Sequence, residues 1–282
     1  MKGPLFIYHG SCFDGFTAAW VYWNINTRAE FWPAKYGAPP PDVHGRDVVI
    51  ADFSYPRGTM LQIASDARTL TVLDHHHTAQ EALAGLDHEC GQLGVAIPTV
   101  VFDMDRSGAG ITWDYFCPRE ERPELVNYVE DRDLWRFKLP DSEAVAALVA
   151  ATPMTFEEWS DLDDTDVHDM AAQGRAILKY IHQYGTKAIA EAALFEWRLE
   201  GAPAIWCMNL PYMNCSEHVT RLLNEKGGVF AAGYFRRADG RWQFSLRSGP
   251  DFDCSAVAKL WGGGGHKQAA GFDVADLSEV FA

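Results

Sequence analysis

The chain has 282 residues, 48% of them hydrophobic, and its 24 Lys and Arg against 39 Asp and Glu give a net charge of −15 at pH 7. This composition excludes a disordered chain, and the negative charge argues against binding of long nucleic acids along a basic track, because that binding depends on Lys and Arg displacing counterions. At roughly 100–200 residues per domain, the length predicts two domains or one large one.

The sequence shows no pattern typical of export or of a membrane protein. It has no run of 18 apolar residues, and its first residues lack the layout of a cleavable signal. The six cysteines are far apart and form no CxxC pair, which predicts neither a disulfide framework nor a zinc ribbon. We therefore expect a cytoplasmic protein without a membrane partner.

Short apolar runs alternate with segments of helical spacing in the first half of the chain. The apolar runs cover residues 5–8, 48–51, 70–73 and 99–102. The helix-like segments cover residues 17–23, 57–67, 107–116 and 123–129. Continuous apolar strands that alternate with helices are typical of a parallel sheet buried on both faces. We therefore predict an α/β N-terminal domain.

A long amphipathic helix is predicted over residues 165–195, because apolar residues recur there with a 3.6-residue period. Its length suits a connector between domains. Beyond residue 201, strands are predicted at 204–208, 229–235 and 242–246, and helices near 216–224 and 255–260. We place the boundary near residue 195, with residues 1–195 as the first domain and 196–282 as a smaller α+β domain.

Imidazole, thiol and carboxylate side chains follow each of the first three predicted strands. They are His9, Cys12 and Asp14 after the first strand, Asp52 after the second, and Asp74, His75 and His76 after the third. Because the carboxyl ends of parallel strands form a common crevice, we expect these residues at one rim. Mixed carboxylate and imidazole ligands suit Mn²⁺ or Mg²⁺, and also Fe or Zn, and two such ions can bridge a phosphate and activate water.

Each of these residues alone also has an ordinary structural explanation. Asp52 could be a turn residue or helix cap, His9 a packed and hydrogen-bonded histidine, and Asp14 part of a turn. The run from Asp74 to His77 directly after an apolar strand is harder to explain in this way, because charged and imidazole groups at a buried strand end are costly unless paired or metal-bound. Together the three strand ends predict a metal site.

This pattern resembles the DHH phosphoesterase superfamily, whose signature is the Asp74-His75-His76 run after a strand. His9 with Cys12-Phe13-Asp14-Gly15 resembles its N-terminal motif, and Asp52 its second-strand aspartate. The four glycines before His266, with Ala269-Ala270-Gly271-Phe272 behind, resemble the GGGH motif of a C-terminal DHHA1 domain. The superfamily includes nanoRNases, pAp-phosphatase-like and RecJ-like members. The motifs extend over nearly the whole chain.

The resemblance implies two divalent ions, with Mn²⁺ as the expected metal. His9 would bind one ion and Asp14 the other, and Asp52 would bridge both. His75 and a later aspartate would complete the second site. We take Asp131 as that later ligand, with Asp133 as the alternative.

The resemblance also assigns roles beside the metals. Asp74 is expected to orient a histidine and His76 to contact the scissile phosphate. Cys12 stands where the superfamily usually has an aspartate. Its thiolate could ligate a softer ion such as Zn²⁺ or Fe²⁺, or the residue could pack as a small apolar side chain.

A second set of residues is predicted to bind substrate. It comprises Arg247, Ser248, Gly263, Gly264, Gly265 and His266. Arg makes bidentate contacts with phosphate, and glycines let the backbone approach a ligand closely. A strand-end salt bridge for Arg247 and a flexible glycine turn are the alternatives.

We therefore expect a hydrolase, a metal-dependent phosphodiesterase that acts on short oligonucleotides as a nanoRNA-type exonuclease through metal-activated water. Residues 1–195 would carry the metals and the connector helix, and the DHHA1 domain would close over the substrate. Alternative substrates are pAp, a cyclic dinucleotide or polyphosphate, and a non-catalytic nucleotide-binding module is the alternative of another class. The partner would be a short oligonucleotide or small phosphorylated nucleotide. The oligomeric state stays open, with a homodimer as one alternative.

Overall fold

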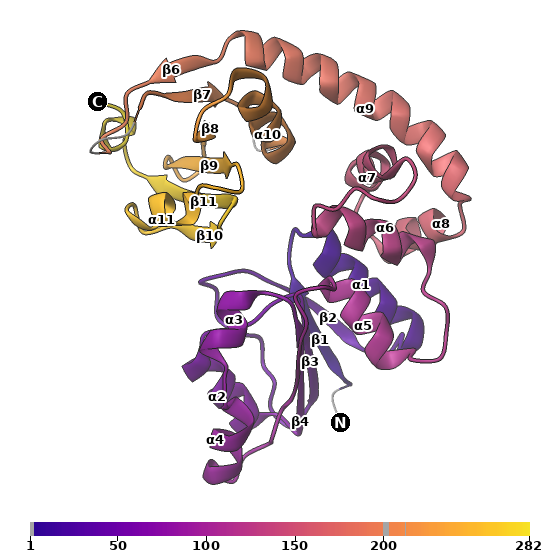
Figure 1. Cartoon of the computed structure of the whole chain (residues 1–282). Helices are drawn as coiled ribbons and strands as arrows, with labels where there is room; N and C mark the ends of the chain where they lie inside the picture. Colours follow the sequence, from indigo (N-terminus) through magenta and orange to yellow (C-terminus); the bar gives the residue numbers. More distant parts are fainter. Residues whose placement is uncertain (1–2, 200–202, 212) are drawn as a thin grey trace. The chain divides into compact units, whose positions relative to one another are not determined.

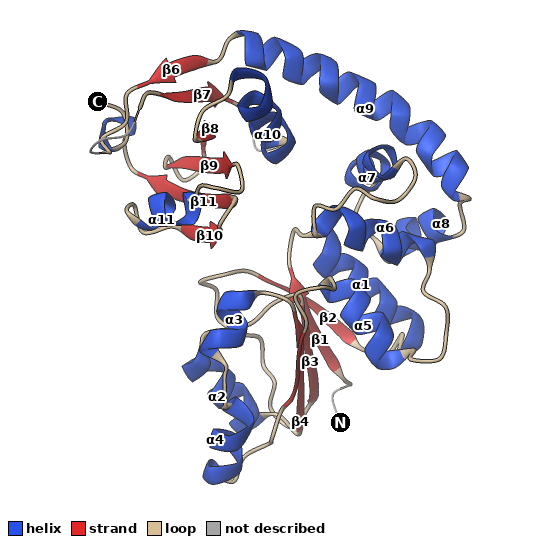
Figure 2. Ribbon diagram, in the orientation of Figure 1, coloured by secondary structure: helices blue, strands red, loops and turns tan. Residues whose placement is uncertain are grey.

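The computed structural model describes residues 3–199, 203–211 and 213–282. The chain divides into two compact units, Met1–Leu178 and Lys179–Ala282. The first unit is a parallel sheet with helices and the second is a smaller mixed sheet with helices (Figures 1 and 2). This confirms the predicted α/β fold with a smaller α+β part, and a long helix runs through the boundary between the units.

The sheet of the first unit has five parallel strands in the order β2-β1-β3-β4-β5. They are β1 (Leu5–His9), β2 (Glu30–Ala34), β3 (Asp47–Ala51), β4 (Thr69–Asp74) and β5 (Thr99–Phe102). The sequence predicted all of them except β2. That strand contains Pro33, which cannot donate a ladder hydrogen bond and argues against a central strand, but β2 lies at the sheet edge, where proline is tolerated.

Helices cover both faces of this sheet, as Figure 2 shows for α2 and α4 on one side and α1 and α5 on the other. Leu5 and Ile7 of β1 point into one core and Phe6 and Tyr8 into the other, so neighbouring residues of the strand are buried on opposite faces. The helices are α1 (Phe13–Ile25), α2 (Arg57–Asp66), α3 (His77–Ala82), α4 (Leu86–Leu93), α5 (Gly108–Phe116), α6 (Glu124–Asp133), α7 (Ser142–Ala151) and α8 (Phe156–Asp163).

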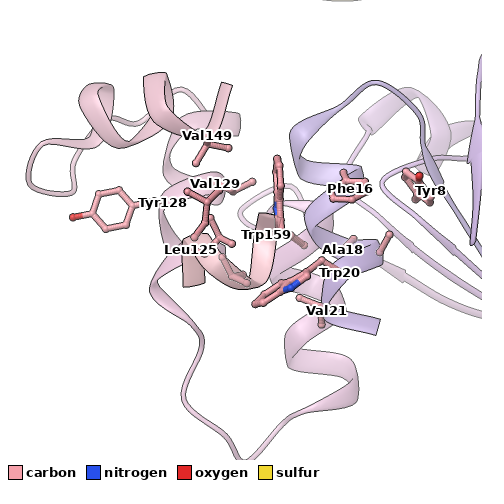
Figure 3. Close-up of a cluster of buried hydrophobic side chains, with 14 of the residues drawn as sticks. Tyr8, Phe16, Ala18, Trp20, Val21, Leu125, Tyr128, Val129, Val149 and Trp159 are labelled. Carbon is pink, nitrogen blue, oxygen red and sulfur yellow. The ribbon is translucent and has the colours of Figure 1, made fainter. Parts of the chain in front are cut away.

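The core around α1 is built on aromatic side chains (Figure 3). Trp159 of α8 is fully buried, meets Phe16 edge to face at 4.9 Å between ring centroids, and donates its indole N–H to Thr17 Oγ1 at 2.9 Å. Burying an aromatic ring of this size stabilises the fold by about 2–3 kcal/mol. These contacts fix α1, which begins directly after β1.

The long helix α9 (Val167–Ala190) ends earlier than the predicted residue 195. Residues 193–195 form strand β6 (Ala193–Phe195), which pairs antiparallel with β7 (Ile205–Asn209). Strand pairing therefore overrides the helical period there. Near its C-terminal end, α9 contributes Ile189 to a core with Met208 and Val219. Because the end of the helix packs in a core of the second unit, the units divide at residue 178, within the helix. The composition of the sequence changes only later, near residue 195.

The second unit has a six-stranded sheet in the order β10-β11-β9-β8-β7-β6. Its further strands are β8 (Phe230–Arg236), β9 (Trp242–Ser248), β10 (Gly264–His266) and β11 (Ala269–Val274). The β7–β8 pair is parallel and the other pairs are antiparallel. Helices α10 (Cys215–Lys226) and α11 (Cys254–Lys259) pack into two separate cores, and a 3₁₀ turn at Leu277–Glu279 follows β11.

The tetraglycine segment lies partly in a strand. Gly264 and Gly265 belong to edge strand β10, which pairs with β11, so the expectation of a glycine loop is only partly correct. All six cysteines lie in the described residues and are free thiols, as the sequence predicted. Within the described ranges, every helix is too short or too polar to cross a bilayer.

Candidate metal centre

Seven potential metal ligands lie together in the first unit: six on or shortly after strands β1, β3 and β4, and Asp133 at the end of helix α6. They form three groups, His9 with Cys12 and Asp52, Asp52 with His75 and His76, and Asp14 with His75 and Asp133. Within each group the potential ligand atoms lie within 4.8 Å of one another. Asp52 belongs to the first two groups and His75 to the last two. The predicted ligands His9, Cys12, Asp14, Asp52 and His75 are thus brought together, and the pair of metal sites stays a prediction.

Asp52 lies directly after β3 in a left-handed backbone conformation, with φ of 53°. Such a conformation costs about 1–3 kcal/mol in a residue other than glycine and persists only where the surroundings enforce it. The Asp52 amide donates to the Leu73 carbonyl at 2.9 Å, which ties the residue to the end of β4. This left-handed conformation, held by the bond to β4, places the Asp52 carboxylate in the cluster.

The two carboxylate oxygens of Asp52 have different environments. Oδ1 lies 3.0 Å from His75 Nε2. Oδ2 is buried and makes no hydrogen bond to any residue that the structure describes; His9 Nδ1 is 3.5 Å away. An unsatisfied buried carboxylate oxygen is costly, and a cation would satisfy it. The donor set therefore fits a metal ion.

Asp14 is fixed by the start of helix α5. Its Oδ2 accepts from the Gly108 amide at 2.6 Å and its Oδ1 from the Ala109 amide at 2.9 Å, where the positive end of the helix dipole also favours a carboxylate. A Cβ at Gly108 would lie 2.5 Å from the Asp52 Cβ and 2.9 Å from Asp14 Oδ2. Gly108 is therefore required for the cluster to close, and this role was missed because the sequence contains no signal for it.

Asp74 contacts His76, the geometry that the expected orienting role requires. Its Oδ1 lies 2.7 Å from His76 Nδ1 and also accepts from the His75 and His76 amides, while Oδ2 accepts from Ser54 Oγ at 2.6 Å. In the neutral imidazole this arrangement places the proton on Nδ1 of His76 and the lone pair on Nε2. The contribution of Ser54 carries no recognisable sequence signal.

Electrostatics within the cluster indicate that negative charge exceeds the positive charge available. Burial and the neighbouring carboxylate of Asp52 raise the pKa of both Asp14 and Asp133. Burial alone would raise the pKa of Asp52, but the hydrogen bond to His75, the nearby His9 ring and the charges of His75 and His76 hold it well below its usual range. Burial opposes the charged form of His75, yet Asp52, Asp14 and Asp133 raise the pKa of this histidine to about 10. A divalent cation bound here would compensate the excess negative charge of these carboxylates.

Cys12, the residue before α1, belongs to the group with His9 and Asp52. Burial, followed by the charges of Asp52, Asp133 and Asp14, raises the pKa of its thiol well above the usual range. A thiol in this environment stays protonated unless a nearby cation stabilises the thiolate. The geometry therefore allows Cys12 to act as a ligand and makes that role dependent on the metal.

The structure favours Asp133 over Asp131 as the later aspartate, which corrects our choice. Asp133 Oδ2 lies 3.6 Å from His75 Nε2. Asp131 instead accepts from the Lys138 and Leu139 amides at 3.0 and 3.2 Å and from Ser142 Oγ at 2.6 Å. Two residues along a helix point in different directions, so Asp131 holds the loop after α6 while Asp133 joins the cluster.

These positions predict opposite effects for two matched substitutions. We expect Asp131→Asn to lower the free energy of unfolding by about 1–3 kcal/mol, because the amide group would face donors, and to leave the metal content unchanged. Asp133→Asn should remove bound metal and leave the thermal unfolding of the metal-free protein near that of the parent. Unfolding curves and metal analysis of both variants check this; loss of metal in Asp131→Asn alone would restore Asp131 as the ligand.

Three of the predicted substrate-binding residues of the second unit, Arg247, Gly264 and His266, lie on one face of its sheet. Arg247 pairs with Ala269, and Ala269 pairs with His266, so these residues lie in one row across β9, β11 and β10 and share a sheet face. Gly264, Gly271 and Ser245 form the next row on the same face.

Ser248 differs from this row because it is buried, and its hydroxyl donates to the Phe252 carbonyl at 2.8 Å. Arg247 donates to Ser216 Oγ at 2.5 Å. Arg247, Gly264 and His266 therefore share a sheet face with few large side chains. Gly265 lies between Gly264 and His266 in β10, and Gly263 directly precedes that strand. Ser248 is used in a structural hydrogen bond instead.

Comparisons with known proteins agree with this organisation. Residues 210–281 match the family model of the DHHA1 domain. An uncharacterized protein of Acanthamoeba polyphaga mimivirus is 26% identical over 299 residues, a match that covers 94% of this chain and 66% of that relative. The chain therefore spans slightly less than two thirds of that relative's length.

Two solved structures share the fold at low sequence identity. An exopolyphosphatase-related protein from Bacteroides fragilis has a TM-score of 0.56 at 11% identity, with 98% of this chain and 88% of that chain covered. A pGpG-specific phosphodiesterase from Vibrio cholerae has a TM-score of 0.51 at 13% identity, with 97% and 94% covered. The DHHA1 match confirms the predicted C-terminal domain, and the two solved structures show that the fold is shared over nearly the whole chain.

Proposed function

We propose that this chain is a metal-dependent phosphoesterase that hydrolyses short oligonucleotides. The observation that carries the proposal is the cluster in which Asp52 joins two groups of potential ligands and keeps one buried oxygen unsatisfied. Of the two proteins with a similar fold, one is called a pGpG-specific phosphodiesterase and the other an exopolyphosphatase-related protein. Both names refer to reactions at phosphorus, which supports a phosphoesterase.

His9, Cys12 and Asp52 would hold one divalent ion, and Asp14, His75 and Asp133 the other. Mn²⁺ is the metal we propose. When bound, such ions polarise a phosphoryl group and lower the pKa of a bound water. The chain itself contributes orientation: the α5 amides hold Asp14, and Asp74 holds His76. In its protonated form His76 would donate its Nε2–H to a phosphate oxygen, and the Asp74 carboxylate favours that form.

The second unit would supply contacts to the substrate. Arg247 offers a bidentate donor for phosphate, and the glycine at 264 leaves the neighbouring backbone open to close approach, since a Cβ there would meet no atom within 4 Å. The net charge of −15 disfavours a long polyanion, so the number of phosphates bound by cationic side chains should be small. A short oligonucleotide fits these features best.

A substrate panel tests the proposal. With Mn²⁺ added, we expect turnover of dinucleotides, with rates that do not increase steadily from two to twenty nucleotides. The panel includes pAp, a cyclic dinucleotide and polyphosphate. Preference for one of these would replace the oligonucleotide as the substrate. Nucleotide binding without turnover of any member would favour the non-catalytic binding module.

Substitution of Cys12 tests whether the thiol binds metal. In the Co²⁺-loaded parent we expect a thiolate-to-cobalt charge-transfer absorption, which should disappear in Cys12→Ser. Cys12→Asp should shift the metal preference toward Mn²⁺, because carboxylate oxygen is a harder ligand than thiolate. Cys90→Ser serves as the control, since Cys90 is buried among apolar side chains of the first unit. An unchanged cobalt spectrum in Cys12→Ser would show that Cys12 only packs.

Substitution of His266 tests the proposed contribution of the second unit. We expect His266→Ala to raise KM and lower turnover of dinucleotides by roughly ten- to a thousandfold, as loss of substrate orientation does. Metal content should stay at the parental value, because the proposed ligands all lie in the first unit. Kinetics and metal analysis check both statements, and loss of a metal ion in this variant would contradict the assignment.

A further inference from the structure

Tyr36 is an exposed aromatic residue that contacts the proposed metal ligand His9. It follows β2, the strand that the sequence did not predict. Its ring meets the His9 ring edge to face at 5.3 Å between centroids and the buried ring of Phe53 at 4.8 Å. Although held by these contacts, Tyr36 remains 61% exposed. One part of the ring therefore packs beside the cluster while the rest faces solvent.

The backbone around Tyr36 is well defined. The Gly10 amide donates to the Ala34 carbonyl at 2.8 Å, which joins the end of β2 to the residue after His9. The Ala38 amide donates to the Lys35 carbonyl at 3.1 Å, so residues 35–38 form a tight turn, and Gly37 takes a φ of 82° that this turn needs. Three prolines follow at 39–41. A ring on such a turn loses little conformational freedom when a ligand binds.

The chemistry of the neighbouring groups limits what this ring could contact. The cluster beside it would bind a phosphate through metal ions, and Tyr36 offers no positive charge for a further phosphate. A flat aromatic surface next to a phosphate site suits a nucleobase, which is joined to its phosphate through a single sugar. We propose that Tyr36 is a specificity-determining residue that stacks on the base of the nucleotide whose phosphate lies at the cluster. This inference rests on the proposed function.

The test compares intact and abasic ligands. The probe is a dinucleotide with a non-hydrolysable phosphonate linkage, together with two counterparts that each lack one base, and Kd is measured by calorimetry with Mn²⁺ present. Stacking on one base accounts for roughly a five- to hundredfold change in affinity. We expect Tyr36→Ala to weaken the intact ligand and one abasic ligand by that factor, and to leave the ligand that lacks the stacked base unchanged.

Three control variants separate stacking from structure. Tyr36→Phe should bind as the parent does, and Tyr36→Leu, which keeps apolar area without an aromatic face, should resemble Tyr36→Ala. Tyr115→Ala should have no effect, because Tyr115 is an exposed tyrosine of the same unit, two helical turns beyond Gly108. Equal weakening of all three ligands by Tyr36→Ala, or no weakening, would overturn the inference.

A parallel hydrolysis assay with the unmodified dinucleotide distinguishes failure of this inference from failure of the proposed function. If the parent binds the dinucleotide but hydrolyses none, the proposed function fails, and the ratio of intact to abasic affinity still decides the role of Tyr36. If hydrolysis occurs and that ratio is the same in parent and Tyr36→Ala, only the inference on Tyr36 fails. Absence of any dinucleotide binding overturns both.

Discussion

Asp52→Asn should reduce the rate of phosphoester hydrolysis by about several hundredfold or more and remove bound metal, while the fold persists. Asp52 belongs to the ligand group with His9 and Cys12, so its replacement by a neutral amide weakens the hold on the ion proposed there. Its Oδ1 also lies 3.0 Å from His75, a proposed ligand of the other ion, so the change disturbs the second site as well. Asparagine keeps the size of the side chain and tolerates the left-handed backbone at φ of 53°. Steady-state kinetics, metal analysis and circular dichroism measure these three quantities.

The matched control for this variant is Asp87→Asn, which changes the same charge at an exposed position in the first turn of α4. It should keep parental activity and metal content. Full activity of Asp52→Asn, or of the parent in excess chelator, would refute the metal-dependent reaction. Loss of activity together with loss of the native circular dichroism spectrum would instead make Asp52 a structural residue.

Gly108→Ala should be nearly as damaging, although Gly108 bears no functional group. The new Cβ would lie 2.5 Å from the Cβ of Asp52, 2.9 Å from its Cα and 2.9 Å from Asp14 Oδ2, so both carboxylates must move. A displacement of about 1 Å at a reacting centre costs around a hundredfold in rate, and overpacking costs about 1–3 kcal/mol in stability. We expect activity to fall by at least about a hundredfold and the melting temperature to fall as well.

Gly58→Ala provides the control for this substitution. Gly58 lies in α2, and a Cβ there would meet no atom within 4 Å, so the variant should be as stable as the parent or more stable by about 0.4–1 kcal/mol. Weakened metal affinity in Gly108→Ala, measured by calorimetry, would show that the rate loss originates at the cluster. Parental activity in Gly108→Ala would mean that α5 can shift without disturbing Asp14 and Asp52.

Local sequence was enough to predict the strands that carry the cluster. The apolar runs at residues 5–8, 48–51 and 70–73 are buried on both faces, and burial on both faces leaves a continuous apolar pattern that is easily recognised. The helix predicted over residues 107–116 is α5, and Ser107 caps it through a hydrogen bond from the Gly110 amide at 3.2 Å. Edge strands β2 and β10 were missed, because proline and glycine obscure a strand whose stability comes from its neighbour. Strands β6 and β11 were also missed, the first because it was assigned to the long helix.

The sequence by itself determined which residue types follow the strands, and hence the chemistry of the centre, because ligand identity is a property of the side chains alone. It favoured Asp131 over Asp133, a choice that the structure corrects, since both lie on α6 and only the packing of that helix decides which one faces His75. Tertiary structure alone decided which residues Gly108 and Tyr36 contact. Gly108 lies against Asp52, 56 residues earlier in the sequence, and Tyr36 lies against His9, 27 residues earlier. Contacts over such separations arise only when the sheet and its helices assemble, and no local pattern encodes them.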